Sequence, residues 1–311
     1  NDKLTAAFVT DSKKVTASNA VVTFTDLENA DVAASALSDI GKVVGSATVQ
    51  NAIKVEATGS ALTAAFVTTT SAVTATSAKV TYSDATDEAL TAAEINLVGD
   101  AVGTVTLKNA VKVTGGHEAL TKAFVTSSTK VTGTTAKVTF TDANTTDVDA
   151  TEITDVVGNV GSVAIQNKIN IKGNKTQVKA ALVDALTKAT ISTDGTTATI
   201  SDAASLSEAN AIAGTTNIKA SFTAGLSDTA SGLTKDATTI SDDMAAVTTD
   251  QSDIKIAITD GDTEEVDATR LSAIGGSTTG AVTVAKAIVV KDTNDKLTAA
   301  FVTDSKKVTA S

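Results

Sequence analysis

The stretch VVTFTD, residues 21–26, sets the first expectation for the fold, because it is a β-branched and aromatic run that ends on an aspartate. In an extended strand, Val22 and Phe24 fall on one face and Thr23 and Thr25 on the other. Related runs end at the aspartates Asp84, Asp142, Asp202 and Asp260. These five aspartates follow one another at almost equal spacing along the chain, so the strand is one part of a repeat.

A second run of residues gives the same period. LTAAFVT at residues 4–10 returns at 62–68, as LTKAFVT at 120–126 and, less closely, as VKAALVD at 178–184. Residues 1–18, NDKLTAAFVTDSKKVTAS, recur letter for letter at 294–311. Five short repeats therefore make one long block, residues 1–293, with the fourth and fifth repeats diverged. The expected units are residues 4–61, 62–119, 120–177, 178–237 and 238–296, and residues 297–311 begin the next block.

Each short repeat is expected to hold two strands and two helices. In the first, helical spacing at 4–8 and 32–40 alternates with strand patterns at 21–25 and 47–55. One strand and one helix in roughly 29 residues predict an α/β tandem-repeat solenoid with parallel strands. The Asp-Gly turn signal inside ATISTDGTTATIS, residues 189–201, favours an alternative, an array of small β-rich, sandwich-like beads.

Composition limits the possible functions. The 311 residues include no cysteine and no proline, 3% are aromatic, and the formal net charge is -11. With few rings, the core must come from Val, Ile, Leu and Ala, so one unit is expected to be weak and to share its core with its neighbours. The acidic balance argues against nucleic acid as a partner. No apolar run approaches the roughly 18 residues of a membrane span, so direct membrane insertion is not expected.

The sequence gives little support for an enzyme. The one histidine, His117, lies in a GGHEA loop between two repeats. Neither a phosphate-binding glycine loop nor a nucleophile elbow is present, and a catalytic triad would have to use that single histidine. We therefore expect no catalytic residue and no cofactor-binding residue.

The strand-ending aspartates are the best-defined polar positions. Each stands just before a helical stripe, which predicts a turn or helix N-cap in which the carboxylate accepts backbone N–H bonds. More acids follow in the same loops, so calcium, which takes six to eight oxygen ligands, is the competing interpretation. The candidate calcium ligands are Asp26, Asp84, Asp142, Asp202 and Asp260. No other cofactor is expected.

Two more side-chain types recur. Asn51, Asn109 and Asn167 share one register and form either an amide ladder or a set of surface turns. Threonines such as Thr23 and Thr25 line one strand face, and such a face either orders water or ice, or is simply solvated.

The segment at 138–158, VTFTDANTTDVDATEITDVVG, and its relative at 257–276, AITDGDTEEVDATRLSAIGG, resemble the Thr/Ala/Val/Asp-rich tandem repeats of giant cell-surface proteins of marine cyanobacteria and other aquatic bacteria. Some of those proteins are linked to adhesion or to swimming without flagella. The resemblance implies an extracellular or cell-surface location and a scaffold role. We therefore expect a structural segment of a secreted or surface fibre or array that associates with further copies of its own repeat. The alternatives are a spacer stalk of a giant adhesin or motility-associated surface protein and, less favoured, an ice- or carbohydrate-binding β-solenoid.

Overall fold

A computed structural model describes residues 2–10, 15, 17–68, 73–126, 131–191, 195–214, 218–302 and 308–310. The chain divides into two compact units. The first comprises Asn1–Asp142, Asp155–Gln166 and Lys188–Thr190, and the second comprises Ala143–Thr154, Asn167–Thr187 and Ile191–Ser311.

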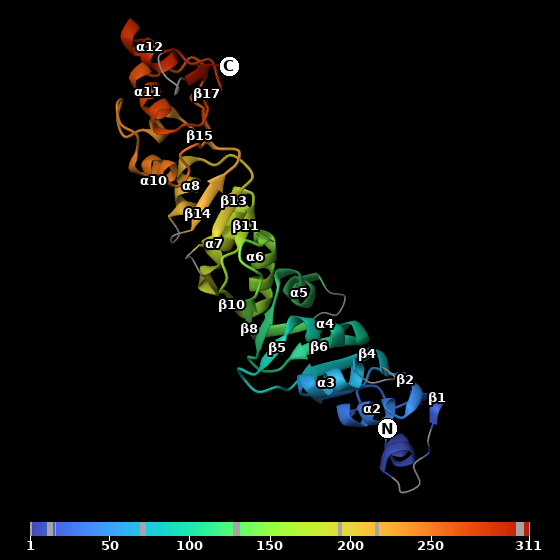
Figure 1. Ribbon diagram of the computed structural model, residues 1–311. Coiled ribbons are helices and arrows are strands. Elements are labelled where there is room, and N and C mark those ends of the chain that lie inside the picture. The colour runs from blue at the N-terminus through green and yellow to red at the C-terminus, as the bar shows by residue number, and fades with distance from the viewer. Residues whose placement is uncertain are drawn as a thin grey trace. The chain divides into compact units, whose positions relative to one another are not determined.

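The first unit is built on a ten-stranded sheet (Figure 1). Its strands are β1 (Ala17–Phe24), β2 (Val44–Val49), β3 (Lys54–Ala57), β4 (Val73–Tyr82), β5 (Ala89–Thr91), β6 (Val102–Leu107), β7 (Lys112–Gly115), β8 (Val131–Phe140), β10 (Val160–Ile165) and β12 (Ala189–Ile191). Hydrogen-bonded neighbours follow the path β1-β2-β4-β6-β8-β10-β12, and β3, β5 and β7 pair beside it. The pairs along β4 and β8 are parallel, as in chains where a helix crosses over between strands.

The predicted α/β tandem-repeat solenoid is wrong. In a solenoid each coil adds one strand to a single stack, so an inner strand has two neighbours. Here β4 pairs with β2, β3 and β6, and β8 pairs with β6, β7 and β10. Both strands have ten residues. Along one edge, the first part of β4 pairs with β2 and its second part with β3, and β8 pairs in the same way with β6 and then β7, whereas a single strand lies along the other edge. The structure is a mixed α/β fold with a large parallel sheet.

The alternative of sandwich-like beads is wrong too. Of the residues that carried its turn signal, Thr193 and Asp194 lie outside the described part of the chain. The strand before them, β12, bonds to β10, whereas the strand after them, β13 (Thr197–Ile200), bonds to β11 and β14. The Asp-Gly run therefore stands between strands of two different sheets, and no hairpin joins β12 to β13 in the described residues.

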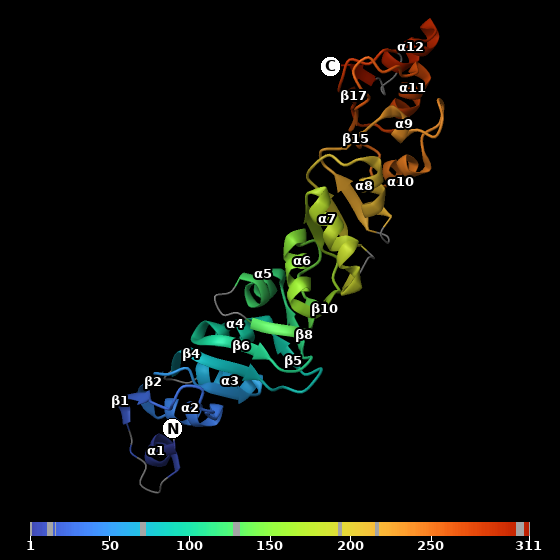
Figure 2. The ribbon, with the colours of Figure 1, turned by 180° about the vertical axis from the view of Figure 1, so that it is seen from behind.

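The helices of the first unit lie beside its strands, as Figures 1 and 2 show from opposite sides for α2, α3 and α4. The helical segments are α1 (Asp2–Thr5), the π-helix η1 (Ala6–Thr10), α2 (Ala34–Gly41), α3 (Gly59–Phe66), α4 (Ala92–Ala101), α5 (His117–Thr121) and the π-helix η2 (Lys122–Thr126); α6 (Ala150–Asn159) has residues in both units. The rings of Phe24, Tyr82 and Phe140 recur once in each of the first three repeats and are fully buried. Each such ring is worth about 1.5–3 kcal/mol when buried.

The second unit contains two four-stranded sheets, and their register-defined pairs are parallel. One consists of β14 (Lys219–Phe222), β13, β11 (Asn170–Gly173) and β9 (Asp147–Asp149), and the other of β15 (Leu226–Asp228), β16 (Ile256–Ile258), β17 (Val282–Val284) and β18 (Val308–Ala310). The helices are α7 (Lys175–Leu182), the 3-10 helix η3 (Asp184–Thr187), α8 (Leu206–Ala213), α9 (Ala230–Leu233), α10 (Asp242–Asp250), α11 (Ala268–Ser277) and α12 (Asn294–Phe301). No described helix has the length and apolar character needed to cross a membrane.

The long strands bulge at a fixed place. The register between β4 and β6 shifts between Ala75 and Lys79, and the exposed pair Thr76 and Ser77 lies in that interval. Gly103 of β6 faces this bulge, because a Cβ atom there would lie 3.0 Å from the backbone oxygen of Thr76. A glycine fits where the two backbones approach so closely, and any larger residue would have to push the bulge outward.

Candidate functional site: strand-end carboxylates at helix starts

Asp84 follows β4 and reaches the first residue of α3. The backbone N–H of Gly59 donates to both carboxylate oxygens of Asp84, at 3.1 Å to Oδ1 and 2.9 Å to Oδ2. Both residues are buried. The first N–H groups of a helix have no partner within the helix, and the positive end of the helix dipole favours an anion there. The carboxylate therefore caps α3 from a position 25 residues further along the chain.

The other aspartates at strand ends repeat this contact. Asp142 accepts from the backbone N–H of His117 at the start of α5, Asp202 from Lys175 at the start of α7, and Asp260 from Ala230 at the start of α9, at distances of 3.0, 2.6 and 2.7 Å. Each carboxylate bonds a helix that precedes it in the chain. The four carboxylates thus accept backbone N–H bonds, but from helices that precede them in the chain and not from the turn or helix that follows.

Asp26 occupies the corresponding place in the first repeat. It lines a recess together with Asp2 and Lys3 of α1 and Thr23 of β1. Asp26 therefore also lies beside the start of the helix that precedes it in the chain, α1.

The residue at the start of the capped helix varies from repeat to repeat. It is Gly59, His117 or Lys175 in α3, α5 and α7, and only the backbone N–H is common to them. His117 adds one contact, because its ring Nδ1 lies 2.6 Å from Oδ1 of Asp142. This histidine supports a structural carboxylate.

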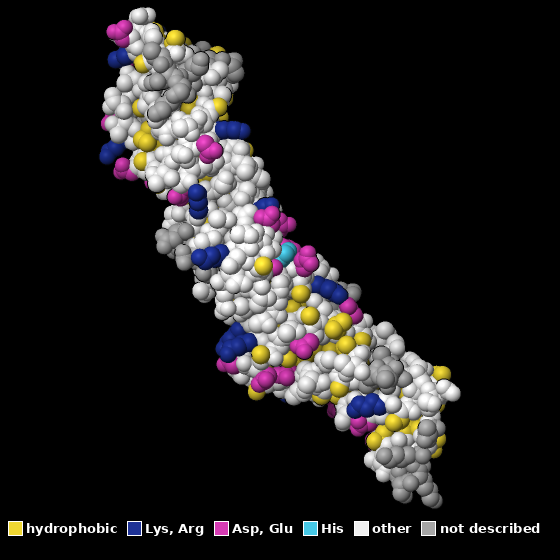
Figure 3. Space-filling view, viewed as in Figure 1, with side chains coloured by type: hydrophobic (Ala, Val, Ile, Leu, Met, Phe, Trp, Pro, Cys, Tyr) yellow, Lys and Arg dark blue, Asp and Glu magenta, His cyan; other side chains and the backbone are white. Residues whose placement is uncertain are grey.

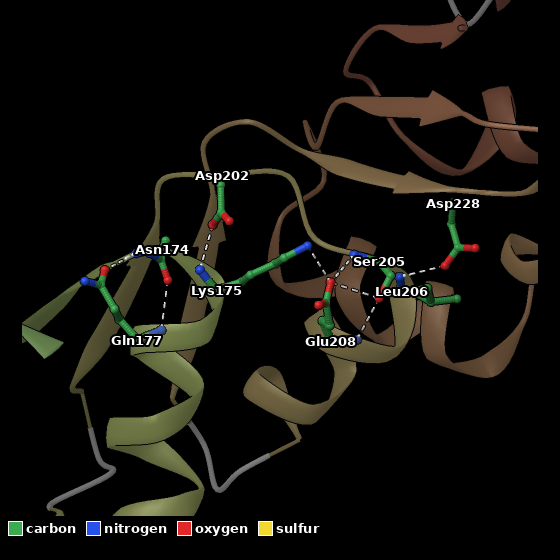
Figure 4. Close-up of polar contacts among 8 residues, drawn as sticks. All are labelled: Asn174, Lys175, Gln177, Asp202, Ser205, Leu206, Glu208 and Asp228. Atoms are coloured by element: carbon green, nitrogen blue, oxygen red, sulfur yellow. Dashed lines mark hydrogen bonds and ion pairs between the residues drawn. The ribbon is translucent and has the colours of Figure 1, made fainter. Parts of the chain in front are cut away.

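Figure 4 shows the same arrangement at the starts of two helices of the second unit, α7 and α8. Asp202 points at the backbone nitrogen of Lys175, and Asp228 points at that of Leu206, with a distance of 2.9 Å for the second pair. The side chain of Lys175 extends to Glu208, at 2.9 Å. Asp228, the last residue of β15 (Leu226–Asp228), was not among the predicted residues.

Side chains within the same helices complete their first turns. Ser205 and Glu208 form a capping box at the start of α8, and Asn174 and Gln177 form one at the start of α7 (Figure 4). The backbone N–H of Ser205, and after it the ammonium group of Lys175, lower the pKa of Glu208. The Ser-x-x-Glu spacing at 205–208 is a signal that sequence reasoning could have used.

The repeated asparagines bond to the same aspartates through the backbone. The side-chain amide of Asn51 donates to the backbone carbonyl of Asp26 at 2.7 Å, and that of Asn109 donates to the carbonyl of Asp84 at 2.6 Å. These two amides bond to backbone and do not form a ladder with each other. Asp84 consequently holds a helix start 25 residues before it and receives an amide 25 residues after it.

The acids that follow the strand ends face lysines. The ammonium group of Lys137 donates to Oδ1 of Asp87 at 2.8 Å, and Lys112 lies 3.8 Å from the same oxygen. The hydrogen bond from Lys137 is the main cause that lowers the pKa of Asp87. Lys172 does the same for the pKa of Asp147. Lys79, which recurs as Lys137 in AKVTYSD at 78–84 and AKVTFTD at 136–142, instead donates to Oδ1 of Asn29 at 2.8 Å.

The calcium interpretation stays a prediction. Throughout the residues that the structure describes, no three acidic or histidine side chains gather closely enough to hold a metal ion. A recess of about 190 Å³ adjoins Asp84 and is lined in part by Glu88 and Glu94. Glu94 already accepts the backbone N–H of Thr91, so one of the oxygens that could bind a cation there is engaged in helix capping.

In comparisons with known proteins, neither a protein-family model nor a curated protein sequence matches the chain.

Proposed function

We propose that this chain is a structural segment of a secreted or cell-surface fibre or array protein. The observation that carries the proposal is that the most regular polar side chains bond the end of a strand to the start of a helix earlier in the chain. Asp84, Asp142, Asp202 and Asp260 each accept a backbone N–H from an earlier helix. A residue that recurs with the repeat period and holds the repeat together is expected of a scaffold.

The charge distribution supports self-association over nucleic acid as the partner. Basic and acidic side chains are interspersed on the face that Figure 3 shows, and the net charge is -11. A nucleic-acid surface needs a continuous basic patch. We accordingly propose further copies of the same repeat as partners, an extracellular or surface location, and no catalytic role.

The alternative is a spacer stalk of a giant adhesin or of a motility-associated surface protein. A fibre must associate with other chains, whereas a spacer has only to hold a distant domain away from the cell. Electron microscopy of the native material separates them. We expect ordered filaments or a lattice with a period matching the long block, residues 1–293. Single unassociated threads would favour the stalk, and material inside the cell would contradict both.

A row of exposed threonines on neighbouring strands supports a second candidate function, binding of ice or ordered water. Thr23, Thr48 and Thr74 are register partners across β1, β2 and β4, and all three are exposed. Parallel strands place such hydroxyls about 4.8 Å apart. A measurement of thermal hysteresis tests this function: replacing Thr48 by Lys should abolish any hysteresis, and a wild-type protein without hysteresis would exclude it.

A further inference from the structure

The recess of about 190 Å³ beside Asp84 has a lining with an excess of negative charge. Three acids line it, Asp84, Glu88 and Glu94, and none of the described residues in its lining is a lysine, an arginine or a histidine. Asp84 is buried, whereas Glu88 and Glu94 are exposed. The side chain of Glu88 makes no ion pair within the described part of the chain. A cation would therefore be favoured in this recess.

Tyr82, which also lines the recess, contributes a buried hydroxyl group. The side chain is fully buried, and its hydroxyl oxygen has no hydrogen-bond partner among the described residues. Burial, and after it the charges of Asp84 and Glu94, raise the pKa of Tyr82, so the hydroxyl group keeps its proton at neutral pH. The same position holds Phe24 in the first repeat and Phe140 in the third, so packing does not require the hydroxyl group. A buried hydroxyl group without a partner is unfavourable, and a ligand in the recess would supply one.

The corresponding places in the next two repeats contain a basic side chain. Gly59 is the first residue of α3, and its counterparts are His117 in α5 and Lys175 in α7. The ring of His117 lies 2.6 Å from the carboxylate of Asp142. The ammonium group of Lys175 lies 2.9 Å from Glu208 of α8 (Figure 4). Gly59 has no side chain, so it brings no basic group to the acids of its own recess.

The acids of the recess correspond to the acids that those basic groups contact. Asp84 and Asp142 both accept the backbone N–H of the first residue of a helix. Glu94 and Glu208 are both the third residue of a helix and both belong to capping boxes, in α4 and α8. In Glu94 the bonds from Thr91 both go to Oε2, so Oε1 can accept from a further donor. Two positions that contact a basic nitrogen elsewhere in the chain are thus combined beside Asp84 without one.

A second recess has the same plan and contains its own basic group. It has a volume of about 140 Å³ and is lined by Asp260 and by Ala230, the first residue of α9. Where the first recess has Glu94, ten residues after Asp84 (94 minus 84), this one has Arg270, ten residues after Asp260 (270 minus 260). A basic side chain is therefore present at α5, α7 and α9, and among the described residues none lines the recess at α3.

We propose that the recess beside Asp84 binds an alkylammonium group supplied from outside the chain. Such a group has three N–H donors, and the carboxylates of Glu88 and Glu94 and the hydroxyl oxygen of Tyr82 are its acceptors. Asp84 adds its charge while it keeps its bond to Gly59. A metal ion fits less well, because within the described residues these acids do not gather closely enough to hold one.

Two sources offer this chemistry, a free amine and a lysine side chain of another copy of the chain. The binding site itself does not depend on the proposed function. Only the second source rests on the proposed self-association. The two sources differ in one measurable respect, because only a lysine of another copy makes occupation of the recess depend on protein concentration.

The test is a titration of the full chain with n-butylammonium chloride at constant ionic strength, followed by amide NMR. We expect saturable shifts at the backbone N–H groups of Gly59, Ser60 and Thr91, which border the recess. n-Butanol has a similar shape without the charge and should cause no such shifts. Calcium chloride, the probe for a metal site, should cause none either.

Four variants assign the binding to the proposed acceptors. Glu88→Gln and Glu94→Gln should each weaken butylammonium binding about two- to fivefold, because both acids are exposed. Glutamine at the third position of α4 can still form the capping box. Tyr82→Phe should weaken binding about two- to tenfold and remain folded, because two sister repeats have phenylalanine there. Glu152→Gln, the corresponding change in α6, is the matched control and should bind as the wild type does.

Sedimentation of the wild type over a range of concentrations distinguishes the sources. A mean mass that rises with concentration and falls again when butylammonium is added identifies a lysine of another copy, and a constant monomer mass identifies a free amine. The proposal is overturned if butylammonium causes no saturable shifts at Gly59 and Ser60, if n-butanol causes equal ones, or if calcium binds there in its place. Unchanged binding in the Glu88, Glu94 and Tyr82 variants overturns it as well. None of these results bears on filaments seen by electron microscopy, so failure here is distinguishable from failure of the proposed function.

Discussion

The carboxylate of Asp84 accepts a hydrogen bond from the backbone N–H of Gly59 at 2.9 Å, although Gly59 lies 25 residues earlier in the chain. Both residues are buried, so water cannot readily replace the carboxylate as the acceptor. The contact joins the end of β4 to the start of α3, which comes earlier in the chain.

Replacing Asp84 by alanine should destabilise the protein by about 1–3 kcal/mol, because it leaves the N–H of Gly59 buried without its acceptor. Asp84→Asn should cost less than half as much, since the amide oxygen can still accept. Urea denaturation measures both. Asp100→Ala, which removes an exposed partner of Lys122, is the control and should change little. An equal loss for the alanine and asparagine variants would contradict the capping role.

Chelation separates this role from calcium binding. If the carboxylates act as helix caps, a chelator should leave the melting temperature of the wild type unchanged. If they hold calcium, removing the ion should lower the melting temperature, because a ligand that binds only the folded state stabilises it. Thermal melts with added calcium and with chelator decide between the two. A drop of several degrees on chelation would establish these loops as metal sites.

Gly103→Ala should destabilise the protein, because the new methyl group would meet the backbone of Thr76 and Ser77 at about 3.0 Å. Gly158→Ala in α6 is the matched control, since a Cβ there meets nothing within 4 Å. Gly158 is the penultimate residue of α6, so alanine there should change stability less than it does at Gly103. Equilibrium unfolding measures both, and a loss at Gly103 no larger than that at Gly158 would refute the close approach.

Thr145→Asn should raise stability by about 1 kcal/mol, because Thr145 has a φ of 67°, a region that disfavours L-residues and β-branched ones most. Asn29 stands at the equivalent position of the first repeat with a φ of 61°. The reverse substitution, Asn29→Thr, should lower stability, and it also removes the acceptor of Lys79. A melting temperature that falls in Thr145→Asn would contradict the prediction.

Lys137→Met should raise the pKa of Asp87 toward its ordinary value. The folded-state pKa of Asp87 is lowered, so its contribution to stability is present above the unfolded pKa and is lost as the pH falls through the folded pKa. The variant should thus be less stable than the wild type at neutral pH and equal to it in strong acid. Lys112→Met should have a smaller effect, because Lys112 is 3.8 Å from the carboxylate and Lys137 is 2.8 Å away. Carboxyl NMR titration of Asp87 measures both.

The sequence predicted features that depend on short spacing. The alternation around Val22 and Phe24 places both side chains in the core, and Thr23 and Thr25 on the exposed face. It did not predict which helix each aspartate caps. That bond joins residues 25 to 30 positions apart in the chain and depends on how the strands and helices pack. The solenoid prediction failed for a related reason. The first half of β4, VTATSA at 73–78, is too poor in large apolar residues to look like a strand, although Val73 and Ala78 are buried. With that half unrecognised, the branching of the sheet could not be foreseen.

The bulge in the long strands marks a place where this fold accepts added chain. In the fourth repeat the strand is divided into β12 and β13, and the chain between register partners is longer for Ile171 with Ala198 than for Val113 with Val138. Both parts nonetheless join sheets. The fourth repeat is thus longer than the third at this point, and Thr76 and Ser77 stand at the corresponding point of the second repeat. A short epitope or a fluorophore-binding tag grafted between Thr76 and Ser77, which are both exposed, would therefore be displayed without removing a residue of the core.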